Sequence, residues 1–265
     1  MIPIWSNHRA EQLSFITRAK RAQRLPEHIE IPLERQSVSV RLRLNRRARR
    51  YTLNLGVGGL DPVLTIPAGG NYDGARYFLE RNLGWLESRL SNRPAARPFR
   101  PGRVVPVRGV NHRIAHRPND RGTVHVENDG RVLILAVSGD REHLQRRLTD
   151  WLRRQARSDL EKAVFRYAAT VEARPTAIRL RDPKGRWGSC SSHGTLSFSW
   201  RLIMAPSVVL DYLAAHEVAH LVEMHHRPAF WQLVHRICPH TDEAEAWLKA
   251  HGAGLHAFGV VDSER

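Results

Sequence analysis

The segment 205–226 constrains the fold of this chain more than any other part of its sequence. Near its start a proline and a serine supply helix-start signals, and apolar positions then lead to His216-Glu217-Val-Ala-His220. Two residues four positions apart share one face of a helix, so His216 and His220 can meet at a single ion. Glu217 points about 100° around the helix axis, from where it can reach a water on that ion without binding the ion itself. The pattern H-E-x-x-H on a helix is typical of zinc hydrolases.

A catalytic zinc site needs a third protein ligand, which must come from chain that has turned away from the helix. His226 lies six positions after His220, and Pro228 can be the first residue of a new helix. The spacing therefore favours His226 as the third ligand. The alternatives are a neighbouring imidazole and three carboxylates: His225, Glu223, Glu243 and Glu245.

These residues predict hydrolysis at one bound zinc ion. Three neutral imidazoles leave the ion its full positive charge and an open position, where a water ionises near neutral pH. Glu217 is then the general base for attack on a polarised carbonyl. Tyr212, four residues before His216, and Arg201 are candidates for contact with the oxyanion or the substrate. For Tyr212 we favour the ordinary alternative, a core tyrosine whose hydroxyl is hydrogen-bonded.

Three short strands are predicted before the metal helix, at 178–181, 186–190 and 195–199. An edge strand beside that helix can pair with an extended substrate backbone and bring its carbonyl to the ion. Trp187 and Trp200 are expected to pack against the helix. Cys190 has no second cysteine at ligand spacing, so we expect it to act as a small apolar residue.

The first half of the chain shows the alternation that predicts half-buried strands. Apolar residues recur at every second position in 38–44 and in 51–57, and further short strands are expected at 63–66 and between 104 and 137. A helix is expected to begin at Asp73. A longer helix is expected at about 140–173, where 144–164 place an apolar residue at every fourth position. No internal repeat is evident in the sequence.

Together these elements predict an α+β fold, with a β-rich N-terminal half followed by a region built around the H-E-x-x-H helix. We expect an N-terminal appendage at 1–28, a β-rich region at 29–139 and a catalytic region at 140–256. In the alternative arrangement, 29–256 forms one compact unit.

The charge of the chain is large, uneven and carried mainly by arginine. The 265 residues have a formal net charge of +16, of which residues 1–150 carry +13 and residues 151–265 carry +3. Arginine pairs well with phosphate and carboxylate, so the Arg-rich N-terminal half is a candidate surface for a polyanion, either nucleic acid or a nucleotide. The alternative explanation is a genome whose codons favour arginine.

Composition also excludes several classes of protein. Two cysteines cannot form a disulfide scaffold, and they favour a reduced compartment. The apolar run at 132–137 is far shorter than the roughly 20 residues that a membrane span needs. The N-terminus shows no signal-peptide core. We therefore expect a cytoplasmic protein that has no membrane partner.

Several segments that occur in order resemble the YgjP-like metallopeptidase family over about residues 30 to 252. The resemblance implies a zincin-like core, related to that of SprT-like and Wss-type zinc proteases. It also implies that His216, His220 and His226 are zinc ligands and that Glu217 is the catalytic base. The segments that carry the resemblance are Arg186–Ser191, Trp200–Pro206, Asp211-Tyr212, His216–His220, Glu223–His226 and Phe230-Trp231.

The chain departs from this family's pattern at two positions. His225 stands where the family often has asparagine, and it adds an imidazole that could compete for the metal. Ser199 stands where asparagine is also common, which changes a polar contact near the site.

Three functions are consistent with the sequence. The first is a zinc-dependent metallopeptidase, in which zinc-activated water hydrolyses a peptide bond of a peptide or protein substrate. The second is a metal-dependent hydrolase of nucleotide phosphate anhydrides, because the same water and base suit phosphoryl attack and arginine would hold the phosphates. The third is a nucleic-acid-associated protease that the basic N-terminal half recruits. A fold that keeps the site only for structure is disfavoured by the intact Glu217.

Overall fold

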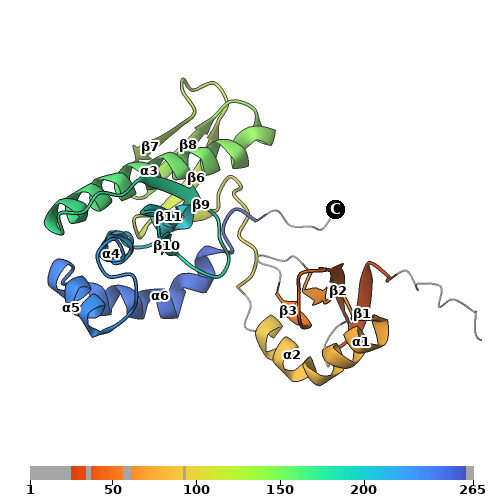
Figure 1. Cartoon of the computed structure of the whole chain (residues 1–265). Helices are drawn as coiled ribbons and strands as arrows, with labels where there is room; N and C mark the ends of the chain where they lie inside the picture. Colours follow the sequence, from red (N-terminus) through yellow and green to blue (C-terminus); the bar gives the residue numbers. More distant parts are fainter. Residues whose placement is uncertain (1–24, 34–36, 56–60, 92–93, 261–265) are drawn as a thin grey trace, which may run out of the picture. The chain divides into compact units, whose positions relative to one another are not determined.

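The computed structural model describes residues 25–33, 37–55, 61–91 and 94–260 (Figure 1). The predicted appendage at 1–28 lies mostly outside the described residues. The described chain forms two compact units, one from 25–33, 37–55 and 61–91 and the other from 94–260. It is a mixed α+β fold in which the N-terminal part of the chain carries two sheets and the C-terminal part is mainly helical. None of the described helices is both long enough and apolar enough to cross a membrane.

The first unit is a four-stranded sheet with two helices. Alternating residues of its strands, such as Ile29, Ile31 and Val40, share a core with the helix residues Leu79 and Leu86. The Asn71 side chain accepts a hydrogen bond from the Gly74 amide at 2.8 Å, and this cap starts the first helix one residue before the predicted position. The sheet order is β1-β2-β4-β3. The elements are β1 (His28–Pro32), β2 (Ser37–Leu44), β3 (Thr52–Asn54), β4 (Val63–Ile66), α1 (Tyr72–Arg81) and α2 (Leu83–Ser91).

The second unit begins with another four-stranded sheet, followed by a long helix. The apolar residues that the sequence places at every fourth position of this helix, from Leu144 to Val164, are buried. The sheet order is β5-β6-β8-β7. The elements are β5 (Val104–Val107), β6 (Val110–Arg117), β7 (Val124–Asn128), β8 (Leu133–Ser138), the short 3₁₀ helix η1 (Arg141–His143) and α3 (Leu144–Thr170).

The division between the units falls between Ser91 and residue 94. Long-range packing explains its position. Val105, Ile114 and Leu135 of the second sheet share one core with Leu148 of α3, and none of them belongs to the core of the first unit. Strands β5–β8 are therefore part of the same unit as the metal helix.

The two sheets repeat one topology. In each, the first two strands are antiparallel, the second and fourth are parallel, the third and fourth are antiparallel, and a helix follows. Three buried residues of the first unit, Ile66, Ala75 and Leu79, have buried counterparts 69 positions later in the chain. These counterparts are Leu135, Leu144 and Leu148. The repeat is not evident in the sequence because the two segments share the spacing of their apolar residues but only a few identical residues, such as Leu79 and Leu148.

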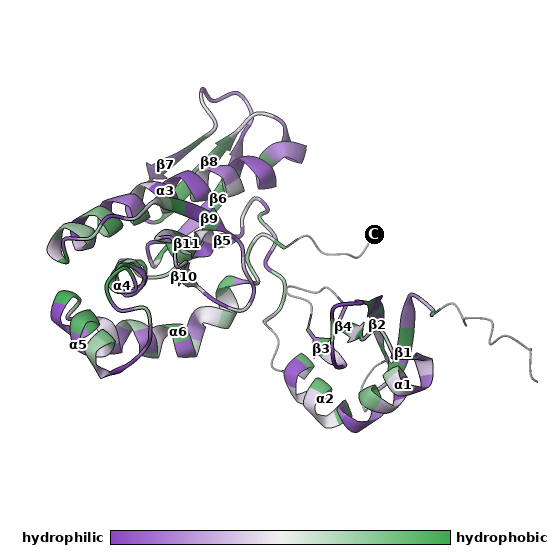
Figure 2. Ribbon diagram, in the orientation of Figure 1, coloured by the Kyte–Doolittle hydropathy of each residue, from purple (hydrophilic) through white to green (hydrophobic). Residues whose placement is uncertain are grey.

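The rest of the second unit holds a three-stranded sheet and three helices. The strands lie close to their predicted positions, and the order β10-β11-β9 leaves β10 at an edge. The helix that carries H-E-x-x-H is buried on most sides, and its ribbon is mainly green, the colour of hydrophobic residues, in Figure 2. The elements are β9 (Ala177–Arg181), β10 (Gly188–Cys190), β11 (Thr195–Ser199), the 3₁₀ helix η2 (Trp200–Met204), α4 (Ser207–Ala219), α5 (Pro228–Ile237) and α6 (Thr241–Leu255).

Candidate metal centre

The last turn of α4 holds the first part of the site. His216 and Glu217 lie within the helix, and His220 is the residue at which it ends. Apolar neighbours bury the helix, so Glu217 is only 4% exposed and His220 only 8% exposed. The amphipathic pattern of a surface helix is absent because α4 packs against α3, α5, α6 and β10.

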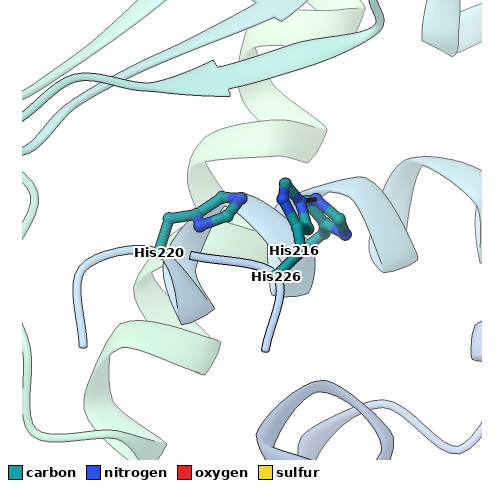
Figure 3. Close-up of side chains that lie close together, drawn as sticks. All are labelled: His216, His220 and His226. Atoms are coloured by element: carbon teal, nitrogen blue, oxygen red, sulfur yellow. Dashed lines mark hydrogen bonds between the residues drawn. The ribbon is translucent and has the colours of Figure 1, made fainter. Parts of the chain in front are cut away.

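His226 lies in the turn between α4 and α5 and forms a group with His216 and His220. The amide of Arg227 donates to the His225 carbonyl at 2.6 Å, and Pro228 occupies the first turn of α5, as the sequence predicted for a new helix. This turn brings Nε2 of His226 to 3.2 Å from Nε2 of His216. One ring nitrogen from each of His216, His220 and His226 lies within 4.8 Å of the others (Figure 3).

The other proposed third ligands lie elsewhere in the described chain. His225 is exposed and does not join the group of three. Glu223 contributes its backbone carbonyl to a hydrogen bond with His220 Nδ1 at 3.1 Å. Glu243 lies 3.9 Å from His240, and Glu245 accepts a hydrogen bond from Tyr212. Geometry therefore selects His226 from the alternatives that spacing leaves open.

The imidazoles of His216 and His220 are oriented by hydrogen bonds, and burial favours the neutral form that a metal ligand needs. Nδ1 of His216 lies 3.2 Å from the Tyr212 hydroxyl, and Nδ1 of His220 faces the Glu223 carbonyl, so Nε2 is the free nitrogen in both rings. Burial, and then the neighbouring charges of His220 and His226, lower the pKa of His216 to about 4. Burial is also the main cause that lowers the pKa of His220.

The ring of Phe230 packs against all three imidazoles. It is fully buried in α5, and its ring centroid lies 4.9 Å from that of His216, 4.4 Å from His220 and 4.8 Å from His226. The sequence marked Phe230 only as part of the family resemblance. Contacts with all three rings limit their rotation, so this side chain helps to hold the ligands in place.

Glu217 follows His216 directly on α4 and has a carboxylate oxygen that is unsatisfied. Its Oε2 is buried and has no hydrogen-bond partner among the described residues. Burial raises its pKa to about 8, and the positive charge of Arg186 opposes that rise. A nearby cation, or a water that donates a hydrogen bond, stabilises the charged form of a buried carboxylate. The three imidazoles form a donor set that fits a divalent metal ion, and the next residue after the first of them carries this carboxylate.

Strand β10 packs against the Glu217 side chain at a glycine. A Cβ atom at Gly188 would lie 2.3 Å from Glu217 Oε1, closer than any side chain allows. The sequence showed Trp187-Gly-Ser-Cys190 as a motif but offered no reason for the glycine. The reason is a contact between residues far apart in the chain, which no local pattern reveals.

Arg201 has a different role from the predicted contact with the oxyanion or substrate. Its guanidinium forms two hydrogen bonds with the Asp182 carboxylate, at 2.7 and 3.1 Å. It also donates to the carbonyls of Leu255 at 3.0 Å and Phe258 at 2.6 Å. Arg201 is therefore a buried structural cation that ties η2 to the end of α6.

A protein family and a solved structure match parts of this chain. A family model described as "YgjP-like, metallopeptidase domain" matches residues 49–251. A comparison with curated proteins found no match. Among solved structures, the chain is similar to the metallopeptidase zymogen of Pyrococcus abyssi abylysin, with 21% identity and a TM-score of 0.32. That match covers 34% of this chain and 92% of the other.

Proposed function

The chain belongs to the YgjP-like metallopeptidase family, and we propose that it is a zinc-dependent metallopeptidase that hydrolyses peptide bonds. The observation that carries this proposal is the convergence of His216, His220 and His226 at the end of the helix that also carries the buried Glu217. Three imidazoles with one open position are a common ligand set of catalytic zinc. Harder cations such as Mg²⁺ prefer oxygen ligands, which this group does not offer.

The proposed chemistry divides between the metal and Glu217. A zinc ion, when bound, supplies a Lewis acid that polarises a carbonyl and lowers the pKa of water to about 7. Glu217 accepts a proton from the attacking water at its unpartnered oxygen and returns it to the nitrogen of the leaving amine. Burial keeps the imidazoles of His216 and His220 neutral, and one nitrogen of each of the three rings stays close to the others.

The free edge of β10 is the proposed position of the substrate backbone. An extended peptide can add to a sheet edge as a further strand, with backbone hydrogen bonds supplying affinity. Because Gly188 of this strand lies against Glu217, a peptide paired there would have its backbone next to the general base. This arrangement favours a peptide as the substrate.

The two alternative functions have weaker support from the geometry. Hydrolysis of nucleotides requires guanidinium groups free to hold phosphates, but Arg201 is held by Asp182. Arg186 is exposed and lies close enough to affect Glu217, so it is the arginine that such a reaction would use. Recruitment by nucleic acid has its support in exposed arginines of the described chain, such as those between β2 and β3 at 46–50.

The test is to compare the zinc-loaded protein with its Glu217→Gln variant on an unfolded protein substrate and on a panel of nucleoside triphosphates. We expect peptide cleavage that the variant loses while it keeps its fold and its zinc. A chelator should abolish cleavage and added zinc should restore it. Phosphate release without proteolysis would replace the proposal with the nucleotide hydrolase. Salt-sensitive DNA binding that enhances cleavage of bound protein would support recruitment by nucleic acid.

A further inference from the structure

We propose that Tyr212 and Glu245 form a hydrogen-bond chain that fixes the tautomer and orientation of His216, which makes them positioning residues for the metal site. The inference rests on the metal site of the proposed function and adds two residues that do not bind the ion. It gives Tyr212 a role other than contact with the oxyanion or the substrate.

The chain of contacts links two helices to the first histidine. Tyr212 lies one turn before His216 on α4 and is only 3% exposed. Its hydroxyl donates to Oε1 of Glu245, on α6, at 2.5 Å. The same hydroxyl oxygen lies 3.2 Å from Nδ1 of His216. The hydroxyl is therefore held on the side of His216 opposite to Nε2, which faces His226.

The number of protons settles the direction of each hydrogen bond. A tyrosine hydroxyl has one proton, and a carboxylate can only accept. The proton between Tyr212 and Glu245 therefore belongs to Tyr212, and the hydroxyl oxygen must accept from Nδ1–H of His216. Nε2 of His216 is then left with its lone pair, in the form that binds a metal.

The properties of Tyr212 fit this direction. Burial, followed by the hydrogen bond to Glu245, raises the pKa of its hydroxyl, so the group keeps its proton and remains a donor. Glu245 also places a negative charge behind the imidazole. Outer partners of this kind hold the ring and make the ligand nitrogen a better donor to the metal.

His220 has an equivalent partner of a different type. Its Nδ1 faces the backbone carbonyl of Glu223 at 3.1 Å. A backbone partner cannot be removed by substitution, but the partner of His216 consists of side chains. The contribution of this partner can therefore be measured.

The experiment measures zinc affinity by competition with a chromogenic chelator in the wild-type protein and in Tyr212→Phe, Glu245→Gln and Glu243→Gln. Phenylalanine keeps the ring and removes only the hydroxyl, and Glu243 provides a matched control on the same helix. We expect Tyr212→Phe to bind zinc roughly 10- to 100-fold more weakly. Glu245→Gln keeps an acceptor but removes the charge, so its affinity should fall less, and Glu243→Gln should match the wild type.

A second measurement separates positioning from simple packing. In the metal-free protein, ¹⁵N chemical shifts should show the His216 proton on Nδ1 in the wild type and shared between both nitrogens in Tyr212→Phe. The double variant should bind zinc no more weakly than Tyr212→Phe alone, because Glu245 acts through Tyr212. Unchanged affinity or an unchanged tautomer in Tyr212→Phe would overturn the inference, and so would additive losses in the double variant.

The measurements do not depend on hydrolysis, so the two proposals can fail separately. If the wild type binds zinc with the expected dependence on Tyr212 but cleaves no peptide, the peptidase proposal fails and this inference stands. If peptide is cleaved and Tyr212→Phe binds zinc like the wild type, the opposite holds.

Discussion

Glu217 combines deep burial with a carboxylate oxygen that has no hydrogen-bond partner among the described residues. In the absence of a metal ion, such a group favours its protonated form, and burial raises its pKa to about 8 from the ordinary value of 4.5. The folded protein therefore binds more protons than the unfolded chain between these two values. Its stability must fall as pH rises through that range, by up to about 1.4 kcal/mol for each pH unit.

The first prediction concerns the stability of the metal-free protein. Glu217→Gln should resist urea more than the wild type at pH 9, because the amide avoids the cost of a buried anion. The difference should shrink steadily as pH falls toward 4.5 and level off below it, where the wild-type carboxyl is protonated in both the folded and the unfolded states. Comparing the two proteins at each pH cancels the opposite effect of His216, whose lowered pKa removes stability as pH falls below 6.5. Equal urea midpoints at pH 9 would contradict the prediction.

The second prediction concerns the choice of the third ligand. His226→Ala should weaken zinc binding more than the 10- to 100-fold loss typical of an outer-shell change, because it removes a ligand from a group that spans 4.8 Å. His225→Ala is the matched control, one residue earlier and exposed, and should bind zinc like the wild type. Chelator competition measures both variants. A larger loss in His225→Ala would identify that residue as the ligand.

At the scale of single elements, the edge strand β10 and the helix α4 form one functional unit. Gly188 of the strand has no side chain, and this leaves room for the Glu217 carboxylate of the helix. The same edge remains free of strand pairing within the described sheet. Because β10 lies close to Glu217, a peptide bound at this edge as proposed would lie near the residue that is proposed to accept the proton.

The third prediction follows from this contact. Gly188→Ala should lower kcat at least tenfold, because the added methyl group would lie 2.3 Å from Glu217 Oε1 and must displace the carboxylate. The zinc ligands are untouched, so zinc content should remain that of the wild type. Gly185→Ala is the control, since a Cβ at Gly185 meets nothing within 4 Å. Steady-state kinetics and metal analysis of the purified variants check the prediction, and wild-type kcat in Gly188→Ala would contradict it.

At the scale of the whole molecule, the chain consists of two compact units with separate hydrophobic cores. Each unit begins with the same four-stranded topology followed by a helix. In the second unit this helix, α3, packs against α4, and the metal site is built on that base. The sheet of the second unit therefore supports the site through α3.

The fourth prediction tests the independence of the second unit. A fragment of residues 92–265 should unfold in one cooperative transition and bind zinc with the affinity of the full chain, because it holds the whole core and all three histidines. A fragment that starts at 140 should fail to fold, since it lacks Val105, Ile114 and Leu135 of that core. Circular dichroism in urea and zinc competition measure both fragments. A folded fragment from 140 would restore the boundary that the sequence predicted.

Local patterns in the sequence were sufficient where the structure depends on neighbours in the chain. Spacing alone placed His216 and Glu217 on a buried helix, and alternation placed most strands within a few residues of their positions. The turn before Pro228 was also predicted, because proline has a local preference for the first turn of a helix. These features are determined by backbone periodicity and by local propensities.

Only the tertiary structure decided the features that depend on residues far apart in the chain. It selected His226 over His225 and the carboxylates, paired Arg201 with Asp182, and placed Gly188 against Glu217. It also placed β5–β8 in the unit of the metal site and revealed the repeated topology. The physical reason is that spacing shows which residues can share a face of one element, whereas the packing of elements determines which faces meet.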